Sequence, residues 1–331
     1  MNLITSVDIP KYGFDISHQS KIVFTGSCFA ENIGLKLKDL KFSVQVNPLG
    51  INYNPMSVGK SLDFAISKKH ISENDLFFAN DLWNCYDFHS HFSKADKAEC
   101  LKHINSSIYL SNGFLKSTEY LFISLGTAYN YSLKSGDSYV SNCHKQADNL
   151  FNRELLKPEQ IVKYWSEIIK GLNGFNKNIK IFFTVSPIRH KRDGFIANQL
   201  SKSVLFVALN ELKVKFGNIF YFPSYEIMMD ELRDYRFYAD DMIHPSDKAV
   251  EYIFEKFGSA FFSKETIMLN SRINKIIRGL NHKVFSLESV SHFEHLKRLK
   301  DEIKTIQNEH DFIDFKNELK NISDTISEIE L

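Results

Sequence analysis

The segment at residues 21–34 constrains the fold of this chain more than any other. It opens with β-branched and aromatic residues, Gly26 permits a sharp turn, and apolar side chains then recur at helical spacing over residues 29–37. This pattern predicts a strand, a tight turn and a helix. In such a turn a small nucleophilic side chain stands beside backbone N–H groups and the positive end of a helix, which stabilise a thiolate or an oxyanion. Ser27 and Cys28 both occupy this position.

Length and composition exclude several classes of protein. With 331 residues the chain can bury one large core or two smaller ones, and its content of 43% hydrophobic and 24% charged residues is that of a globular protein. The formal net charge is +1, so no global electrostatic attraction to nucleic acid or to an anionic membrane is expected. No stretch reaches the roughly 18 apolar residues of a membrane span, and the first residues lack a basic segment followed by an apolar core. We therefore expect a cytoplasmic protein without a membrane span and without a nucleic-acid partner.

The cysteines and histidines indicate neither a disulfide framework nor a metal site. The four cysteines are far apart in the sequence, and no pair has the spacing of a structural zinc site. His89 and His91 would share one face of a strand, but no carboxylate or cysteine follows at a suitable spacing. We therefore expect no metal and no tightly bound cofactor.

Taken in order, the chain alternates strands with helices, which predicts an α/β sandwich around a mostly parallel sheet. After the first strand, further strands are expected at 42–46, 119–125, 179–185 and 219–222, and two more should flank residues 135–137. Helices are expected at 57–67, 95–111, 158–172, 198–216 and from 246 to about 257. The aromatic and polar stretch 75–92 has no clear period, and we interpret it as an insertion over one end of the sheet.

The character of the chain changes after residue 262. Residues 269–330 are charged, low in glycine and proline, and carry apolar residues at helical spacing, which predicts a helical hairpin or a small coiled coil. We thus divide the chain into an enzyme-like domain at 1–262, with the aromatic insertion at 70–118, and a helical extension at 263–331. The expected role of the extension is packing or partner contact, including self-association.

A second polar motif lies far downstream of the first. Asp241 and His244 are three residues apart, and Pro245 fixes the turn that follows them. In this arrangement His244 faces a nucleophile while Asp241 holds the other ring nitrogen.

Several ordered segments together carry a family resemblance. They lie at 26–30, 47–55, 125–128, 142–145, 185–190 and 234–246. On these segments the chain resembles the GSCFA family, whose members are similar to the SGNH (GDSL-like) hydrolases. The resemblance covers the first 260 residues and implies an SGNH-hydrolase-like three-layer sandwich. The family itself has no settled activity.

The resemblance implies roles for individual residues. Aligned without gaps on the Gly-Asp-Ser block of SGNH enzymes, Cys28 falls on the nucleophile and Ser27 on the aspartate. An acyltransferase family of polysaccharide biosynthesis resembles this fold and carries Gly-Asn-Cys at the same place, which favours Cys28, with Ser27 as the alternative. The SGNH oxyanion glycine falls on Gly50, and the Asp-x-x-His pair falls on Asp241 and His244.

One block departs from the SGNH pattern. Gly126 opens the Gly-x-Asn block, but Ala128 occupies the position of its asparagine, which would supply an oxyanion donor. The candidates to replace that donor are Asn54, Asn130 and Asn142.

Two further segments are expected to line the site. One contains His144, and the other follows a strand end with Arg189 and His190. Arg189 or Lys191 could contact the phosphates of an acyl donor such as coenzyme A.

Two hypotheses from different classes follow. The first is an SGNH-like acyl-ester hydrolase or O-acyltransferase that acts on an acylated carbohydrate or another small ester. The second, favoured by Ala128, is a non-catalytic module that binds carbohydrate or peptidoglycan fragments, or a scaffold that docks through its C-terminal helices.

Overall fold

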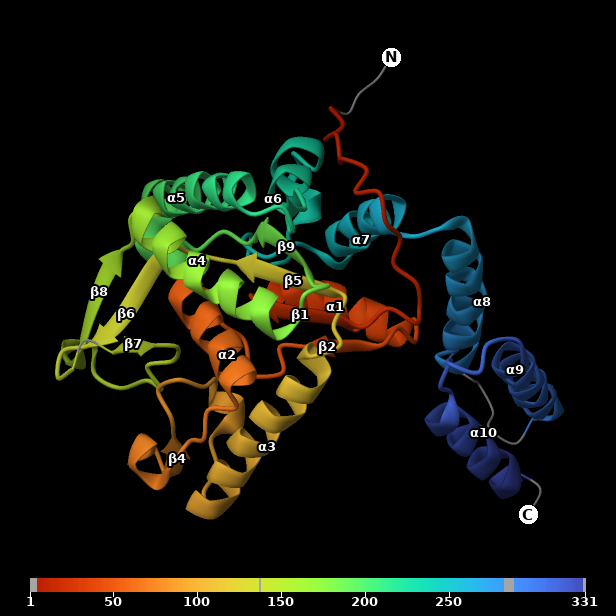
Figure 1. Cartoon of the computed structure of the whole chain (residues 1–331). Helices are drawn as coiled ribbons and strands as arrows, with labels where there is room; N and C mark the ends of the chain where they lie inside the picture. Colours follow the sequence, from red (N-terminus) through yellow and green to blue (C-terminus); the bar gives the residue numbers. More distant parts are fainter. Residues whose placement is uncertain (1–4, 137, 283–288, 330–331) are drawn as a thin grey trace.

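The protein is an α/β sandwich built on a five-stranded parallel sheet (Figure 1). The account rests on a computed structural model that describes residues 5–136, 138–282 and 289–329. The strand order is β10-β9-β5-β1-β2. The strands are β1 (Ile22–Gly26), β2 (Val44–Val46), β5 (Tyr120–Leu125), β9 (Lys180–Val185) and β10 (Ile219–Tyr221). The α/β class and the mostly parallel sheet expected from the sequence are therefore confirmed.

Helices cover both faces of this sheet because neighbouring strand residues point to opposite sides. Val23 belongs to a hydrophobic cluster formed with α2–α5, whereas Phe24 belongs to a second cluster formed with α1 and α7. The first group is α2 (Pro55–Ser67), α3 (Lys97–Leu115), α4 (Pro158–Phe175) and α5 (Gly194–Lys215). The second is α1 (Cys28–Asp39) and α7 (Asp247–Phe261). The short α6 (Ser224–Glu226) follows β10, and its Tyr225 belongs to the first cluster. Three layers result, as the resemblance implied.

The strand order places a crevice next to β1. This strand pairs in parallel with β2 on one side and with β5 on the other. The order of the chain thus reverses direction between β1 and β5, and open α/β sheets bind ligands at such a point, beyond the carboxyl ends of the strands. Residues Ser27 and Cys28 follow β1 directly.

Two smaller sheets add to the sandwich. The antiparallel sheet β7-β6-β8 consists of β6 (Tyr129–Leu133), β7 (Tyr139–Val140) and β8 (Phe151–Leu155), and a hairpin pairs β3 (Phe77–Ala79) with β4 (Leu82–Asn84). The strands expected around 135–137 are confirmed as β6 and β7, although Asp137 lies outside the described residues. Strand β8 and the hairpin were missed, because β8 is polar and largely exposed, and the hairpin strands are only three residues each.

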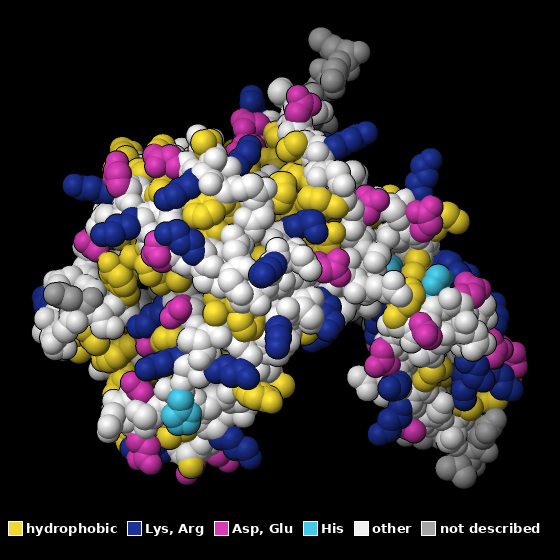
Figure 2. Space-filling model, in the orientation of Figure 1, with side chains coloured by type: hydrophobic (Ala, Val, Ile, Leu, Met, Phe, Trp, Pro, Cys, Tyr) yellow, Lys and Arg dark blue, Asp and Glu magenta, His cyan; other side chains and the backbone are white. Residues whose placement is uncertain are grey.

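The C-terminal region forms helices α8 (Lys264–Leu280), α9 (Val290–Glu309) and α10 (Lys316–Ile329), which project from the sandwich as a lobe in Figure 1. The helical extension expected from the sequence is therefore confirmed, as three helices within the described residues, which leave out 283–288 and 330–331. Buried side chains of α8–α10 continue the cluster formed with α1 and α7, and Lys41 pairs with Glu318 at 2.5 Å. Figure 2 shows charged side chains of both signs interspersed over the lobe. Among the described helices, none has the length and apolarity needed to cross a membrane.

Gly26 is required where β1 enters the turn. Its φ is +119°, and a Cβ atom at this position would lie 2.1 Å from the carbonyl oxygen of Ser124 on β5. The N–H group of Ser27 donates to that same oxygen at 3.0 Å. A side chain at residue 26 would therefore force two central strands apart.

We expect Gly26→Ala to lower the free energy of unfolding by at least about 2 kcal/mol, because it adds both backbone strain and a clash with backbone atoms. Gly113→Ala is the matched control, since that glycine is exposed in α3 and a Cβ atom there meets nothing within 4 Å. The control should gain about 0.5–1 kcal/mol. Urea unfolding of both variants checks this, and equal stabilities would contradict the packing argument.

Candidate active site

A cavity of about 570 Å³ lies beyond the carboxyl ends of β1, β5 and β9. Residues from each strand end line it, among them Cys28, Gly126 and Ser186, and His244 lines it from the loop before α7. The small antiparallel sheet adds an aromatic wall with Tyr129 and Tyr131. The structure thus brings the two sequence motifs to one cavity although they lie more than 200 residues apart.

Ser27 is committed to local structure. It is the N-cap of α1, and its Oγ atom accepts a hydrogen bond from the N–H group of Phe29 at 3.3 Å. The same oxygen shares a hydrogen bond with Oγ of Ser124 at 2.8 Å. Ser27 borders the cavity beside Cys28, but it is only 1% exposed and its hydroxyl is engaged in these hydrogen bonds.

Cys28 is the first residue of α1 and is half-buried. Its Sγ atom lies 3.5 Å from the hydroxyl oxygen of Tyr53. Burial, and then the hydrogen bond to Cys28, raise the pKa of the Tyr53 phenol above its ordinary value. The phenol therefore stays protonated and can donate to a sulfur anion. No hydrogen-bond acceptor within the described parts of the chain occupies the N–H group of Cys28.

Asp241 orients the imidazole of His244. Oδ2 of Asp241 lies 2.5 Å from Nδ1 of His244, and Oδ1 accepts the N–H groups of Ile243 and His244 at 3.0 Å each. Because Nδ1 donates to a carboxylate, Nε2 is the nitrogen left to accept a proton. No hydrogen bond joins His244 to Cys28 in the described structure, although both line the same cavity.

Gly50 is a turn residue in this geometry. Its φ is +90°, and its N–H group donates to the carbonyl of Asn47 at 2.8 Å. It is not among the cavity-lining residues described. The amide that the resemblance assigned to the oxyanion is therefore already engaged within the turn.

Asn54 does line the cavity, from the N-terminus of α2. Its Oδ1 atom accepts the N–H group of Ser57, and its Nδ2 atom donates to Oγ of Ser57, both at 2.9 Å. One hydrogen of Nδ2 remains for a ligand.

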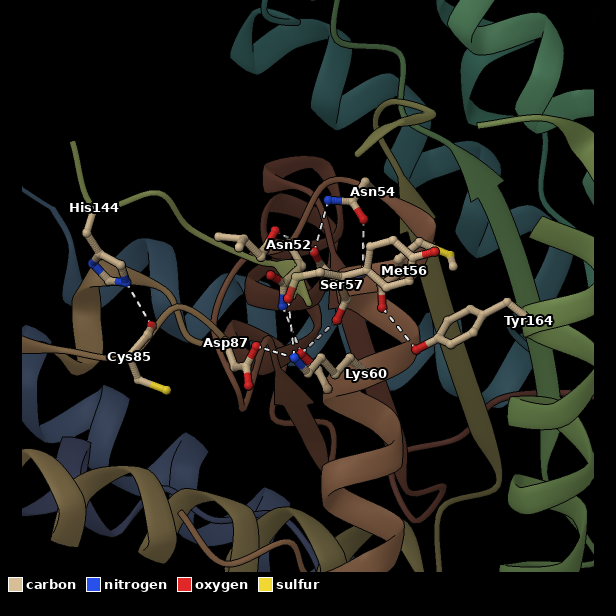
Figure 3. A network of polar contacts seen from close by, with 12 residues as sticks. Asn52, Asn54, Met56, Ser57, Lys60, Cys85, Asp87, His144 and Tyr164 are labelled. Atoms are coloured by element: carbon tan, nitrogen blue, oxygen red, sulfur yellow. Dashed lines mark hydrogen bonds and ion pairs between the residues drawn. The ribbon is translucent and has the colours of Figure 1, made fainter. Parts of the chain in front are cut away.

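The polar network in Figure 3 holds this end of α2 in place. Oγ of Ser57 donates to the carbonyl of Val140 at 3.3 Å, and Tyr164 donates to the carbonyl of Met56 at 3.1 Å. Lys60 and Asp87 form an ion pair one turn further along the helix. The Asn54 amide is consequently anchored to β7, to α4 and to the loop after β4.

The remaining predicted site residues divide into two groups. Those that line the cavity are Gly126, Asn142, Arg189 and His190. Those outside the described lining are Asn130 and His144, and Ala128 joins them. His144 is buried, and its Nε2 atom lies 2.8 Å from the carbonyl oxygen of Cys85. Ala128 is fully buried, and its N–H group donates a hydrogen bond to Oγ of Ser201. Asn130 is fully buried, and neither amide atom has a partner among the described residues.

Sequence reasoning missed Tyr53, Tyr129, Tyr131 and Arg153 as lining residues. Tyr53 lies within a motif segment, so its position could have been used. Arg153 comes from β8, which has no apolar pattern, and only the antiparallel pairing with β6 brings it to the cavity. The described residues include no cluster of three or more His, Cys, Asp or Glu side chains suited to a metal ion.

The pKa of Asp241 gives a direct test of this geometry. Hydrogen bonds from the N–H groups of His244 and Ile243, followed by that from the His244 ring, lower the pKa of Asp241 to about 2. Ionised Asp241 therefore adds stability above the ordinary value of about 4, and this contribution is lost as the pH falls through about 2.

We expect the side-chain carboxyl of Asp241 to titrate with a midpoint near 2 by carbon NMR. In His244→Ala the midpoint should rise but stay below the ordinary value, because both backbone donors remain. A wild-type midpoint near 4 would contradict the described hydrogen bonds.

Comparison with known proteins places the chain in a family. The model of the "GSCFA family" matches residues 21–257, and that of the "GSCFA domain protein, C-terminal domain" matches residues 273–328. No curated protein matches. Among solved structures, an acetyl xylan esterase (Est2A) from the rumen bacterium Butyrivibrio proteoclasticus aligns with a TM-score of 0.35 and 10% identity. That alignment covers 82% of this chain and 66% of the other, just under two thirds of its length. From the family match over most of its length, the chain belongs to the GSCFA family.

Proposed function

We propose that the protein is an acyl-ester hydrolase or O-acyltransferase in which Cys28 is the nucleophile, His244 the general base and Asp241 the residue that orients His244. The observation that carries this proposal is the shared cavity: Cys28 and an imidazole held through Nδ1 both line it. A nucleophile, a base and a group that orients the base are the parts that acyl transfer requires.

The surroundings of the two candidate nucleophiles favour Cys28 over Ser27. The Ser27 hydroxyl is buried, hydrogen-bonded to Ser124 and used as a helix cap. The Cys28 thiol is half-buried and borders the cavity at the positive end of α1. A helix N-terminus favours the thiolate, which is the reactive form.

The chemistry then proceeds through an acyl-enzyme. Nε2 of His244 accepts the thiol proton, and the sulfur attacks the carbonyl carbon of the ester. The oxygen of the tetrahedral intermediate is stabilised by the N–H group of Cys28 and by the Nδ2 group of Asn54. The intermediate collapses, the alcohol leaves with the proton from His244, and water or an acceptor hydroxyl cleaves the thioester. Catalytic hydrogen bonds are often long before substrate binds, which fits the missing contact between Cys28 and His244.

The substrate we propose is an acylated carbohydrate or another small ester. Tyr53, Tyr129 and Tyr131 provide broad apolar faces with polar edges along the cavity.

A thiol nucleophile also suits transfer from a thioester donor such as coenzyme A. Saturating coenzyme A should then raise the melting temperature, whereas a hydrolase gains nothing from it.

Substitutions at Cys28 and Ser27 distinguish the proposed nucleophile from the residue that caps helix α1. Cys28→Ala should lower turnover of an activated acyl ester by at least about 1,000-fold, and His244→Ala by about 100-fold or more, with the fold retained. Ser27→Ala is the matched control and should cost about 0.5–2 kcal/mol of stability while keeping most of the turnover.

Steady-state kinetics and thermal unfolding of the three variants check this expectation. Loss of turnover only in Ser27→Ala would reverse the assignment. Equal, uncatalysed rates in the wild-type protein and all variants would favour the alternative, a non-catalytic binding module or scaffold.

A further inference from the structure

The charge of the cavity contrasts with the near-neutral chain. Four cationic side chains line it, and the lining within the described residues includes no aspartate or glutamate. They are Arg153, Arg189, Lys191 and Arg192. The chain as a whole carries a formal charge of only +1. Composition therefore does not explain this concentration of positive charge, which raises the local concentration of anions.

Two of these cations are already neutralised. Arg153 forms an ion pair with Asp193 at 2.5 Å, and its guanidinium lies 3.9 Å from the ring centroid of Tyr129. Arg192 lies 3.6 Å from a carboxylate oxygen of Asp148, on an exposed part of the rim. These side chains shape the wall, but their charge is shared with acidic partners.

Arg189 is held rigidly without being neutralised. Its Nη1 atom donates to Oε1 of Gln199 and to the hydroxyl of Tyr225, both at 3.1 Å, and that hydroxyl donates to the same Oε1 at 3.0 Å. Within the described chain, Arg189 makes no ion pair, and its Nη2 and Nε groups have no partner. A planar guanidinium with free donors and a fixed orientation suits two-point recognition of phosphate or carboxylate oxygens.

A buried lysine, Lys202, interacts electrostatically with Arg189. Lys202 is completely buried, and its Nζ atom donates to the carbonyl of Ser186 at 2.5 Å. Burial, and then the charge of Arg189, lower the pKa of Lys202 to about 7. Neither Arg189 nor Lys202 has a carboxylate partner among the described residues, so the Arg189 charge is left without a countercharge there.

The loop that carries Arg189 is joined by a backbone hydrogen bond to the loop that carries His244. The N–H group of Arg189 donates to the carbonyl of Ile243 at 3.1 Å, which ties its loop to the residue before His244. Arg189 and His244 both line the cavity. An anionic group bound to Arg189 would therefore lie in the same cavity as Cys28 and His244.

We propose that the cavity selects a small ester carrying a phosphate or carboxylate group, and that Arg189 binds this group. The ester part of the inference rests on the proposed function, whereas the anion site can be tested by binding alone.

The binding test uses the full-length protein and two probes, inorganic phosphate and benzoate, by calorimetry and thermal shift. Arg189→Gln should weaken binding of the preferred probe by about 10- to 100-fold, because it removes charged hydrogen bonds. Arg192→Gln, which removes an equal charge from the rim, should have a much smaller effect. The probe that binds more tightly identifies the anionic group.

The selectivity test compares 4-acetoxybenzoate with its neutral methyl ester. In the wild-type protein kcat/KM should favour the anionic ester, and Arg189→Gln should lower the ratio of the two kcat/KM values to about one, whereas Arg192→Gln should largely keep the wild-type ratio. If neither probe binds, or if Arg192→Gln weakens binding as much as Arg189→Gln, the proposed anion site is refuted. Arg189-dependent binding without turnover of either ester would support the anion site and count against the proposed ester chemistry.

Discussion

The contact between Gly26 and the backbone of Ser124 is the constraint on which the site depends. The two residues pair near the ends of two neighbouring central strands. The φ of Gly26 is +119°, and a Cβ atom there would lie 2.1 Å from the Ser124 carbonyl oxygen, so only glycine fits. The N–H group of Gly26 also donates to Oδ1 of Asn47, at the end of β2. The turn is thereby locked between three strands, and α1 must start at Cys28. The place of Cys28, the proposed nucleophile, follows from sheet packing rather than from contacts that the thiol makes.

Around this fixed point the cavity combines two kinds of side chain. One kind is fixed by local hydrogen bonds: Asp241 accepts two from His244 and one from Ile243, and Asn54 is held by its bonds with Ser57 at the start of α2. The other kind is cationic, and Arg189 keeps donors free because neutral partners hold it. Both features place polar groups before a ligand arrives, which lowers the reorganisation that binding requires.

Local motifs could be predicted from the sequence, but distant contacts could not. The strand, turn and helix around Cys28 follow from apolar spacing and one glycine, and the pairing of Asp241 with His244 follows from their spacing of three residues. The resemblance also indicated the family and the parallel sheet. It did not show that the N–H group of Gly50 closes its own turn, or that β8 carries Arg153 to the cavity, because both depend on backbone contacts without a sequence period. The preference for Cys28 over Ser27 as the proposed nucleophile likewise depends on burial and hydrogen bonds, which the identities of two adjacent residues do not reveal.

The central claim is a thioester acyl-enzyme on Cys28, and trapping it is the most direct test. The purified protein would be treated with a short-chain activated acyl ester, and the acylated peptide located by mass spectrometry in the wild type and in His244→Ala. The account predicts acylation at Cys28 that depends on His244, with the buried Cys85 and Cys100 unmodified. Acylation at Ser27, or labelling of Cys28 that is unchanged in His244→Ala, would contradict it.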